Sequence, residues 1–165
     1  MANKKRETQT KNLVLKYNFN SFIEYNQNIS NRKIEKIEYA TMGCYGTCPI
    51  FELTLIPNKE SIFKANNFNF HNNIESYSEN GEGNFKTHLK KETFKELSDL
   101  LNYIDFENLE DNYSVGWTDD SECILKITYD GGKIKTISDY GMSGTYGLKK
   151  VHDYLHKIRF NQNWK

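Results

Sequence analysis

Apolar and polar residues alternate with a period of two along much of the chain, as they do in strands that bury one face. The turn residues Pro57-Asn58 and Asn80-Gly81 separate several of these segments and favour hairpins. In the first half of the chain, the alternation predicts strands at Leu13 to Phe19, Ile37 to Tyr39, Phe51 to Leu55, Ile62 to Phe63, Phe68 to Tyr77, and Phe85 to Leu89. These strands are expected to form an antiparallel meander.

The spacing of apolar residues then changes to three and four, which is typical of a helix with one buried face. The first such helix is predicted around Phe94, Leu97, Leu100, Leu101 and Ile104, and the second around Leu148, Val151, Leu155 and Ile158. Between them, alternation returns in Cys123 to Tyr129 and in Ile134 to Ser138. Because Cys123 alternates with Leu125 and Ile127, it is predicted to be buried in the sheet. Asp130-Gly131-Gly132 joins these two segments and predicts a hairpin turn.

This order of elements predicts an α+β fold with a single antiparallel β-sheet, built of a meander and hairpins and covered on one face by two principal helices. A length of 165 residues fits one domain. Residues 1–11 lack apolar periodicity and are expected to be a flexible polar tail, so the domain is predicted to span residues 12–165. Although the mean hydropathy is low at -0.78, 11 Tyr and 10 Phe supply large side chains for a core.

The charges balance, with 22 Lys and Arg against 22 Asp and Glu. A general nucleic-acid binder needs an excess of basic residues, so no nucleic-acid partner is expected. No apolar run is long enough to cross a membrane, and no membrane partner is expected. The polar, basic start Met1 to Lys11 has the pattern of neither a signal peptide nor a lipoprotein anchor, which predicts a cytoplasmic protein.

The charge is nevertheless uneven along the chain. From Glu92 to Glu122 there are ten acidic residues and one basic residue, Lys95, giving a net charge of -9 that the rest of the chain offsets. A solvated helix face and the loop after it would account for much of this stretch. The alternative is a docking surface for a basic partner or a cation.

The most unusual local sequence is Met42-Gly-Cys-Tyr-Gly-Thr-Cys-Pro49, which runs directly into a predicted strand. Its glycines and proline favour a tight turn in which Cys44 and Cys48 lie close together. The Cys-x-x-x-Cys spacing is one residue longer than the redox motif of thioredoxin-like proteins, and no helix start follows to lower a thiol pKa. We expect two reduced thiols that pack as small apolar groups beneath the turn, and a redox role is the alternative. A zinc site would need further ligands, and we expect neither a metal nor any other cofactor.

The same segment, Cys44-Tyr-Gly-Thr-Cys-Pro-Ile-Phe51, resembles the opening signature of a family of bacterial proteins, the domain of unknown function DUF6438. The similarity continues through the helix that ends at Phe106, the Tyr113 and Thr118-Asp119 region, and Asp139-Tyr140-Gly141. It covers roughly residues 33 to 160. The resemblance implies a shared fold, and it implies no activity.

Two further motifs come close to known chemistry. His152 and His156 lie one helical turn apart, as in zinc proteases, but Asp153 stands among the residues between them where a longer Glu would serve as base. Packing at the boundary of the core explains the two histidines without metal. The segment Gly141-Met-Ser-Gly-Thr145 misses the spacing of a nucleophile elbow, and its expected role is entry to the last helix, with Ser143 or Thr145 as N-cap.

Our leading hypothesis is a small noncatalytic binding or interaction domain whose partner is an unknown protein or small ligand. The binding surface would be presented by the Cys44 to Pro49 turn and the Trp117 to Asp120 loop, since exposed aromatic and acidic loop residues are ordinary recognition groups. The candidate site residues are Cys44, Tyr45, Cys48, Trp117, Asp119, Asp139 and Tyr140. The alternative is a thiol-dependent redox enzyme or sensor that uses Cys44 and Cys48, and a weaker rival is a hydrolase that uses Ser143 with His152 or His156.

Overall fold

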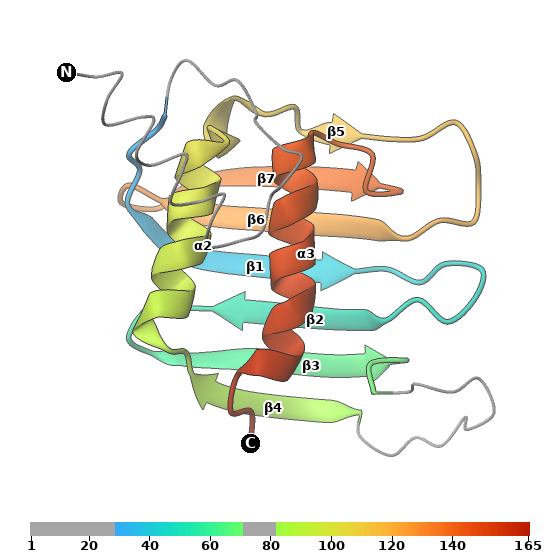
Figure 1. Ribbon diagram of the computed structural model, residues 1–165, viewed down its shortest axis with the longest axis horizontal. Helices are drawn as coiled ribbons and strands as arrows, with labels where there is room; N and C mark the ends of the chain where they lie inside the picture. Colours follow the sequence, from blue (N-terminus) through green and yellow to red (C-terminus); the bar gives the residue numbers. More distant parts are fainter. Residues whose placement is uncertain (1–28, 71–81) are drawn as a thin grey trace.

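The computed structural model describes residues 29–70 and 82–165. Figure 1 shows one sheet with two helices lying across it. The strands are β1 (Ile34–Thr41), β2 (Ile50–Leu55), β3 (Glu60–Asn67), β4 (Gly83–His88), β5 (Asn112–Tyr113), β6 (Glu122–Tyr129) and β7 (Lys133–Tyr140). The helices are α2 (Lys91–Tyr103), the short 3-10 helix η1 (Phe106–Asn108) and α3 (Tyr146–Asn161). The prediction of an α+β fold with two principal helices is therefore confirmed.

The sheet is mixed, with strand order β4-β3-β2-β1-β6-β7-β5. β5 pairs with β7 in parallel, and the other neighbouring strands pair antiparallel. The predictions of a purely antiparallel sheet and of a simple meander are thus wrong. After β4 the chain passes through α2 and returns on the far side of β1, so β6 pairs with β1 rather than with its predecessor in sequence. Alternation of apolar and polar side chains predicts that a segment is a strand, but it does not determine which other strand that segment pairs with.

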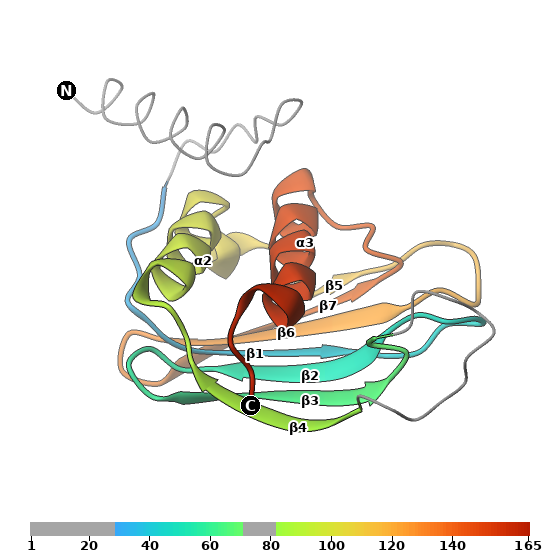
Figure 2. The same ribbon diagram turned by 60° about the horizontal axis from the view of Figure 1, so that its bottom comes forward.

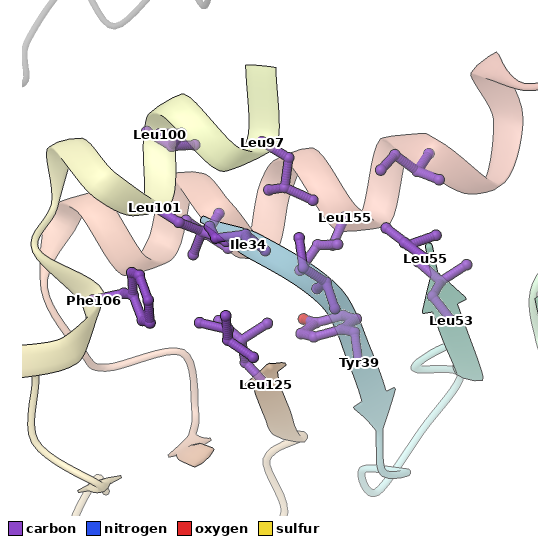
Figure 3. Close-up of a cluster of buried hydrophobic side chains, with 14 of the residues drawn as sticks. Ile34, Tyr39, Leu53, Leu55, Leu97, Leu100, Leu101, Phe106, Leu125 and Leu155 are labelled. Atoms are coloured by element: carbon purple, nitrogen blue, oxygen red, sulfur yellow. The ribbon is translucent and has the colours of Figure 1, made fainter. Parts of the chain in front are cut away.

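Both helices cover the same face of the sheet, as Figure 2 shows. The buried faces of α2 and α3 supply the apolar layer above the strands, and each fully buried large side chain contributes about 1.5–3 kcal/mol to folding. On the sheet, alternate residues such as Leu53, Leu55 and Leu125 point into this layer (Figure 3). The apolar residues of α2 and α3 with no exposed surface are Leu97, Leu100, Leu101, Leu148, Val151, Leu155 and Ile158.

Two predicted strands lie partly or wholly outside the described residues. Residues 68–70 are not in a strand, and β3 pairs directly with β4 through Phe63 and Phe85. The predicted strand from Leu13 to Phe19, the polar tail and residues 71–81 lie outside the described residues. Within the described part of the chain, neither helix is both long and apolar enough to cross a membrane.

Three loops gather at one end of the sheet, on the right in Figure 1. β1 ends there and β6 begins there, with Thr41 paired to Cys123. β7 ends beside them, with Tyr140 paired to Glu122. The β1–β2, β5–β6 and β7–α3 loops therefore lie next to one another, although they are far apart in sequence.

Candidate functional site

The β1–β2 loop is a turn closed by a disulfide between Cys44 and Cys48, whose Cα atoms are 5.7 Å apart. This separation is ordinary for a disulfide. The two cysteines were expected to lie together as reduced thiols, so their proximity is confirmed and their reduced state is corrected. Because the turn folds the chain back on itself within five residues, it brings the two sulfur atoms into bonding range.

Hydrogen bonds fix the base of this turn to the start of β6. The Met42 N–H donates to the Glu122 carbonyl at 2.8 Å. The Ser121 hydroxyl donates to the Met42 carbonyl at 2.7 Å. On the other side, the Thr41 hydroxyl donates to the Pro49 carbonyl at 2.7 Å. The turn is therefore held at both of its ends as well as across its middle.

The β5–β6 loop is organised around Asp120. One of its carboxylate oxygens accepts a hydrogen bond from the Trp117 indole N–H at 3.1 Å, and the other accepts one from the Ser121 backbone N–H at 2.8 Å. These bonds favour the charged form and lower the pKa of Asp120 below its ordinary value, the Trp117 bond having the larger effect. The Asp120 N–H in turn donates to the Tyr140 hydroxyl at 2.9 Å. Trp117 is thus tied at its edge to a carboxylate that stays ionised.

The two loops touch each other, since the Tyr45 N–H donates to the Asp119 carbonyl at 3.3 Å. The contact leaves large side chains in solvent: Tyr45 is 90% exposed, Trp117 62% and Met42 50%. We call the group Met42, Tyr45, Trp117, Asp119 and Asp120 the loop-end surface. Five of the seven predicted site residues, Cys44, Tyr45, Cys48, Trp117 and Asp119, lie in its two loops, and Tyr140 supports it from β7.

Gly141 allows the β7–α3 loop to approach the β5–β6 loop closely. Gly141 has a φ of +76°, and a Cβ at this position would lie 2.8 Å from a Val115 methyl group and 3.2 Å from an Asp120 carboxylate oxygen. Both the backbone conformation and the space therefore require glycine. The glycine-rich segment that resembles an incomplete nucleophile elbow is a packing element beside the loop-end surface.

Asp139, the remaining predicted site residue, does not belong to this surface, because it has no exposed area. Its carboxylate accepts hydrogen bonds from the backbone N–H groups of Ser143 at 2.8 Å and Gly144 at 3.1 Å. It also lies 2.9 Å from His152 Nε2. Asp139 thus holds the β7–α3 loop against the start of α3, where the predicted capping by Thr145 is confirmed by its bond from the Leu148 N–H.

His152 continues this buried network to β1. Its Nδ1 atom lies 3.1 Å from the Tyr39 hydroxyl, and His152 and Tyr39 are 0% and 2% exposed. Since a carboxylate only accepts, the His152 Nε2–H donates to Asp139, and the Tyr39 hydroxyl completes the network at Nδ1. We call Asp139, His152 and Tyr39 the buried network. Figure 3 shows Tyr39 among apolar side chains.

Sequence reasoning missed this network. The available signals were the phase of His152, which shares its helix face with Leu148 and Leu155, and the inward position of Tyr39 in its strand. The network has the order of a carboxylate, an imidazole and a hydroxyl that nucleophilic enzymes use. Its hydroxyl is enclosed, however, and no substrate can reach it in this structure.

The other titratable groups on the same face of α3 are also packed against the sheet. Burial, with help from Arg159 and His152, lowers the pKa of His156 to about 4, so the ring is neutral at pH 7. Burial likewise lowers the pKa of Arg159 to about 10. The Arg159 guanidinium lies 4.3 Å from the centre of the Phe51 ring and donates to Asn69 Oδ1 at 2.8 Å. These groups serve the contact between helix and sheet.

The metal-site and hydrolase hypotheses both depend on His152 and His156. No group of three or more His, Cys, Asp and Glu side chains in residues 29–70 and 82–165 is placed to hold a metal ion. The Ser143 hydroxyl donates to the Tyr140 carbonyl at 3.1 Å, while both ring nitrogens of His152 are engaged by Asp139 and Tyr39. The geometry therefore does not support Ser143 as a nucleophile activated by His152.

Comparison with known families agrees with the resemblance carried by the Cys44 to Phe51 segment. The family model of the domain of unknown function DUF6438 matches residues 35–159. The chain belongs to the DUF6438 family. No curated protein gives a significant match. In this DUF6438 domain the matched span runs from β1 almost to the end of α3, so it contains both the loop-end surface and the buried network.

Proposed function

We propose that this DUF6438 domain is a noncatalytic binding module that recognises a partner protein or small ligand through the loop-end surface. The observation that carries the proposal is the exposure of Tyr45 and Trp117 on two loops that are themselves firmly held. Large aromatic side chains supply much of the binding energy at protein interfaces.

The rigidity of the loops supports recognition. A disulfide closes one loop, the Asp120 carboxylate accepts two hydrogen bonds within the other, and the Tyr45 N–H joins the two. A surface that is ordered before binding loses less conformational entropy on binding. The loops that carry the two aromatic side chains are therefore ordered before a partner binds.

The residues of the buried network and Cys123 lie outside the loop-end surface and are closed off from solvent. Tyr39, His152 and Asp139 are between 0% and 2% exposed. Cys123 is fully buried, and burial raises the pKa of its thiol to about 11, so little reactive thiolate forms at neutral pH. The accessible part of the loop-end surface offers aromatic rings and carboxylates, which suit binding.

The proposal is tested by capture from cells of the source organism with three tagged forms of the protein. These are the wild type, the surface variant Tyr45→Ala with Trp117→Ala, and a control variant Ile134→Ala with Phe160→Ala. The control removes two other exposed apolar side chains, which are 59% and 61% exposed. We expect a ligand that is retained by the wild type and by the control and lost by the surface variant. Equal capture by all three forms would contradict the proposal.

A second candidate function is thiol–disulfide exchange, which is favoured by one observation: Cys44 and Cys48 are joined in a turn that is partly open to solvent. A dithiol of a partner would reduce this bond and become a disulfide itself. Reduction of oxidised glutathione by added dithiothreitol, with Cys44 and Cys48 alternating between disulfide and dithiol, tests this candidate when the wild type is compared with a Cys44→Ser, Cys48→Ser variant. Activity that depends on both cysteines would favour it over the binding module.

A further inference from the structure

We propose that the loop-end surface binds an extended segment of a partner protein that carries Lys or Arg, with cationic side chains placed on the exposed Trp117 and Tyr45 rings beside Asp119 and Asp120. This inference rests on the proposed function and names the chemistry of the partner. It is drawn from the exposed rings, the fixed position of one of them, and the charge around them.

The faces of the Trp117 and Tyr45 rings can attract a cation. The π face of an aromatic ring attracts cations, and Trp does so most strongly. The Trp117 indole is bound at its N–H edge to Asp120, which fixes its orientation while 62% of the side chain stays exposed. Tyr45 stands in the adjoining turn with 90% of its surface in solvent. Two aromatic groups that are open to a cation thus project from neighbouring loops.

The charge on the surface has one sign. The turn of residues 42–49 and the loop of residues 114–121 together contain Asp119 and Asp120 and no Lys or Arg. The pKa of Asp120 lies below its ordinary value, so its charge persists well into the acidic range. The stretch from Glu92 to Glu122 carries a net charge of -9 and would attract a basic segment from a distance. Charge complementarity therefore favours a cationic partner over an anionic or neutral one.

The shape of the surface favours a polypeptide segment over a small molecule. Small ligands occupy concave pockets that bury most of their surface. A cavity of about 310 Å³ among the described residues lies along β5 and β7 and is lined by Asp111, Asn112, Ile134, Lys135, Thr136 and Ser138. None of these residues belongs to the loop-end surface. Tyr45 and Trp117 instead stand out on separate loops, where successive side chains of an extended segment can reach both.

The test uses the fluorescence of Trp117 in the full chain with Trp164→Phe, which leaves Trp117 as the only tryptophan. The probes are three acetylated, amidated peptides of equal length in which Gly alternates with Arg, Glu or Ser. We expect the Arg peptide to change the fluorescence with a saturable curve, and the Glu and Ser peptides to cause no saturable change. Because salt screens the attraction between opposite charges, the affinity for the Arg peptide should fall as the NaCl concentration is raised.

Matched variants show whether binding depends on these residues. Because a cation–aromatic contact at an exposed site is worth about 0.5–1 kcal/mol, Tyr45→Ala should weaken binding of the Arg peptide by roughly two- to fivefold. Asp119→Asn with Asp120→Asn should weaken it further. The control Glu92→Gln with Asp153→Asn removes the same charge from the two helices and should leave the affinity within twofold of the parent.

Several results would overturn the inference. Equal effects of the two charge variants would show a general attraction to an acidic protein. Preference for the Glu or Ser peptide at Trp117 would leave the binding module standing and exclude a cationic partner. If no peptide changes the Trp117 signal, the cationic partner is also excluded, while the binding module is judged by the capture experiment alone.

Discussion

The buried network and the loop-end surface lie close together in the structure but use polar residues in opposite ways. In the network, Asp139, His152 and Tyr39 satisfy one another and neighbouring backbone groups, and they have almost no exposed area. At the surface, Tyr45 and Trp117 leave most of their area in solvent while their loops are fixed by other contacts. The first region encloses its polar groups, whereas the second exposes aromatic rings and carboxylates to solvent.

This difference shows why residue type alone is a weak guide to function. An aspartate, a histidine and a tyrosine in hydrogen-bonded order resemble catalytic machinery, but in this protein they join α3 to β1 and to the β7–α3 loop. Buried polar groups are costly when unpaired, so such a network strongly favours one arrangement of helix and sheet. Access to solvent separates a structural network from a site that can meet a ligand.

The largest expected effect comes from breaking the buried network. Asp139→Ala leaves the Ser143 and Gly144 N–H groups and the His152 ring without their acceptor, and we expect the free energy of unfolding to fall by about 3–5 kcal/mol. Urea denaturation followed by circular dichroism measures this loss. The control Asp153→Asn changes a carboxylate on the surface of α3 and should cost less than about 0.5 kcal/mol. Similar stability of the two variants would contradict a structural role for the network.

The second prediction concerns pH and the interior face of α3. Because the pKa of His156 is about 4 in the folded protein and 6.5 is its ordinary value, the unfolded chain binds a proton more readily. Stability from this group is fully present above pH 6.5 and is lost as the pH falls toward 4, by about 3 kcal/mol in all. Urea midpoints at pH 7 and pH 4.5 measure the change. His156→Gln should reduce the loss, and an unchanged loss would contradict the assignment.

The third prediction concerns the Cys44–Cys48 disulfide beside the loop-end surface. Replacing Cys44 and Cys48 by Ser removes a small covalent loop, and the entropy of closing such a loop sets the expected loss of stability at about 2 kcal/mol or less. Binding at the loop-end surface should weaken, because the turn that carries Tyr45 is less ordered. Thermal melting and a thiol-exchange assay on the same variant separate the two candidate functions. A variant that melts like the parent but loses a measurable thiol activity would favour the redox candidate.

The smallest effect on stability is expected at the surface itself. Tyr45→Ala with Trp117→Ala removes side chains that are mostly in solvent, so the free energy of unfolding should change by less than about 0.5 kcal/mol. The same variant should lose its ligand. Urea denaturation and the capture experiment measure these two properties on one protein. A large loss of stability would mean that the two rings belong to the fold rather than to a binding surface.

Much of the local structure could be predicted from the sequence. The two helices and the strands β1 to β4, β6 and β7 follow from the spacing of apolar residues, since each period places side chains on one face. The burial of Cys123 followed from its alternation with Leu125, and the structure confirms it. The closeness of Cys44 and Cys48 followed from a short turn. These features depend on residues that are near one another in the chain.

The tertiary structure alone decided how the elements meet. β1 pairs with β6 and β5 lies parallel to β7 because of the path of the chain around the helices, which alternation does not encode. Tyr39 and His152 are separated by 113 residues, and their contact exists only after α3 packs on the sheet. The same packing encloses Asp139, whereas the meeting of Tyr45 with the Asp119 carbonyl leaves two rings in solvent. Local periodicity thus determined which face of each element is apolar, and long-range packing determined which polar groups are buried and which can bind.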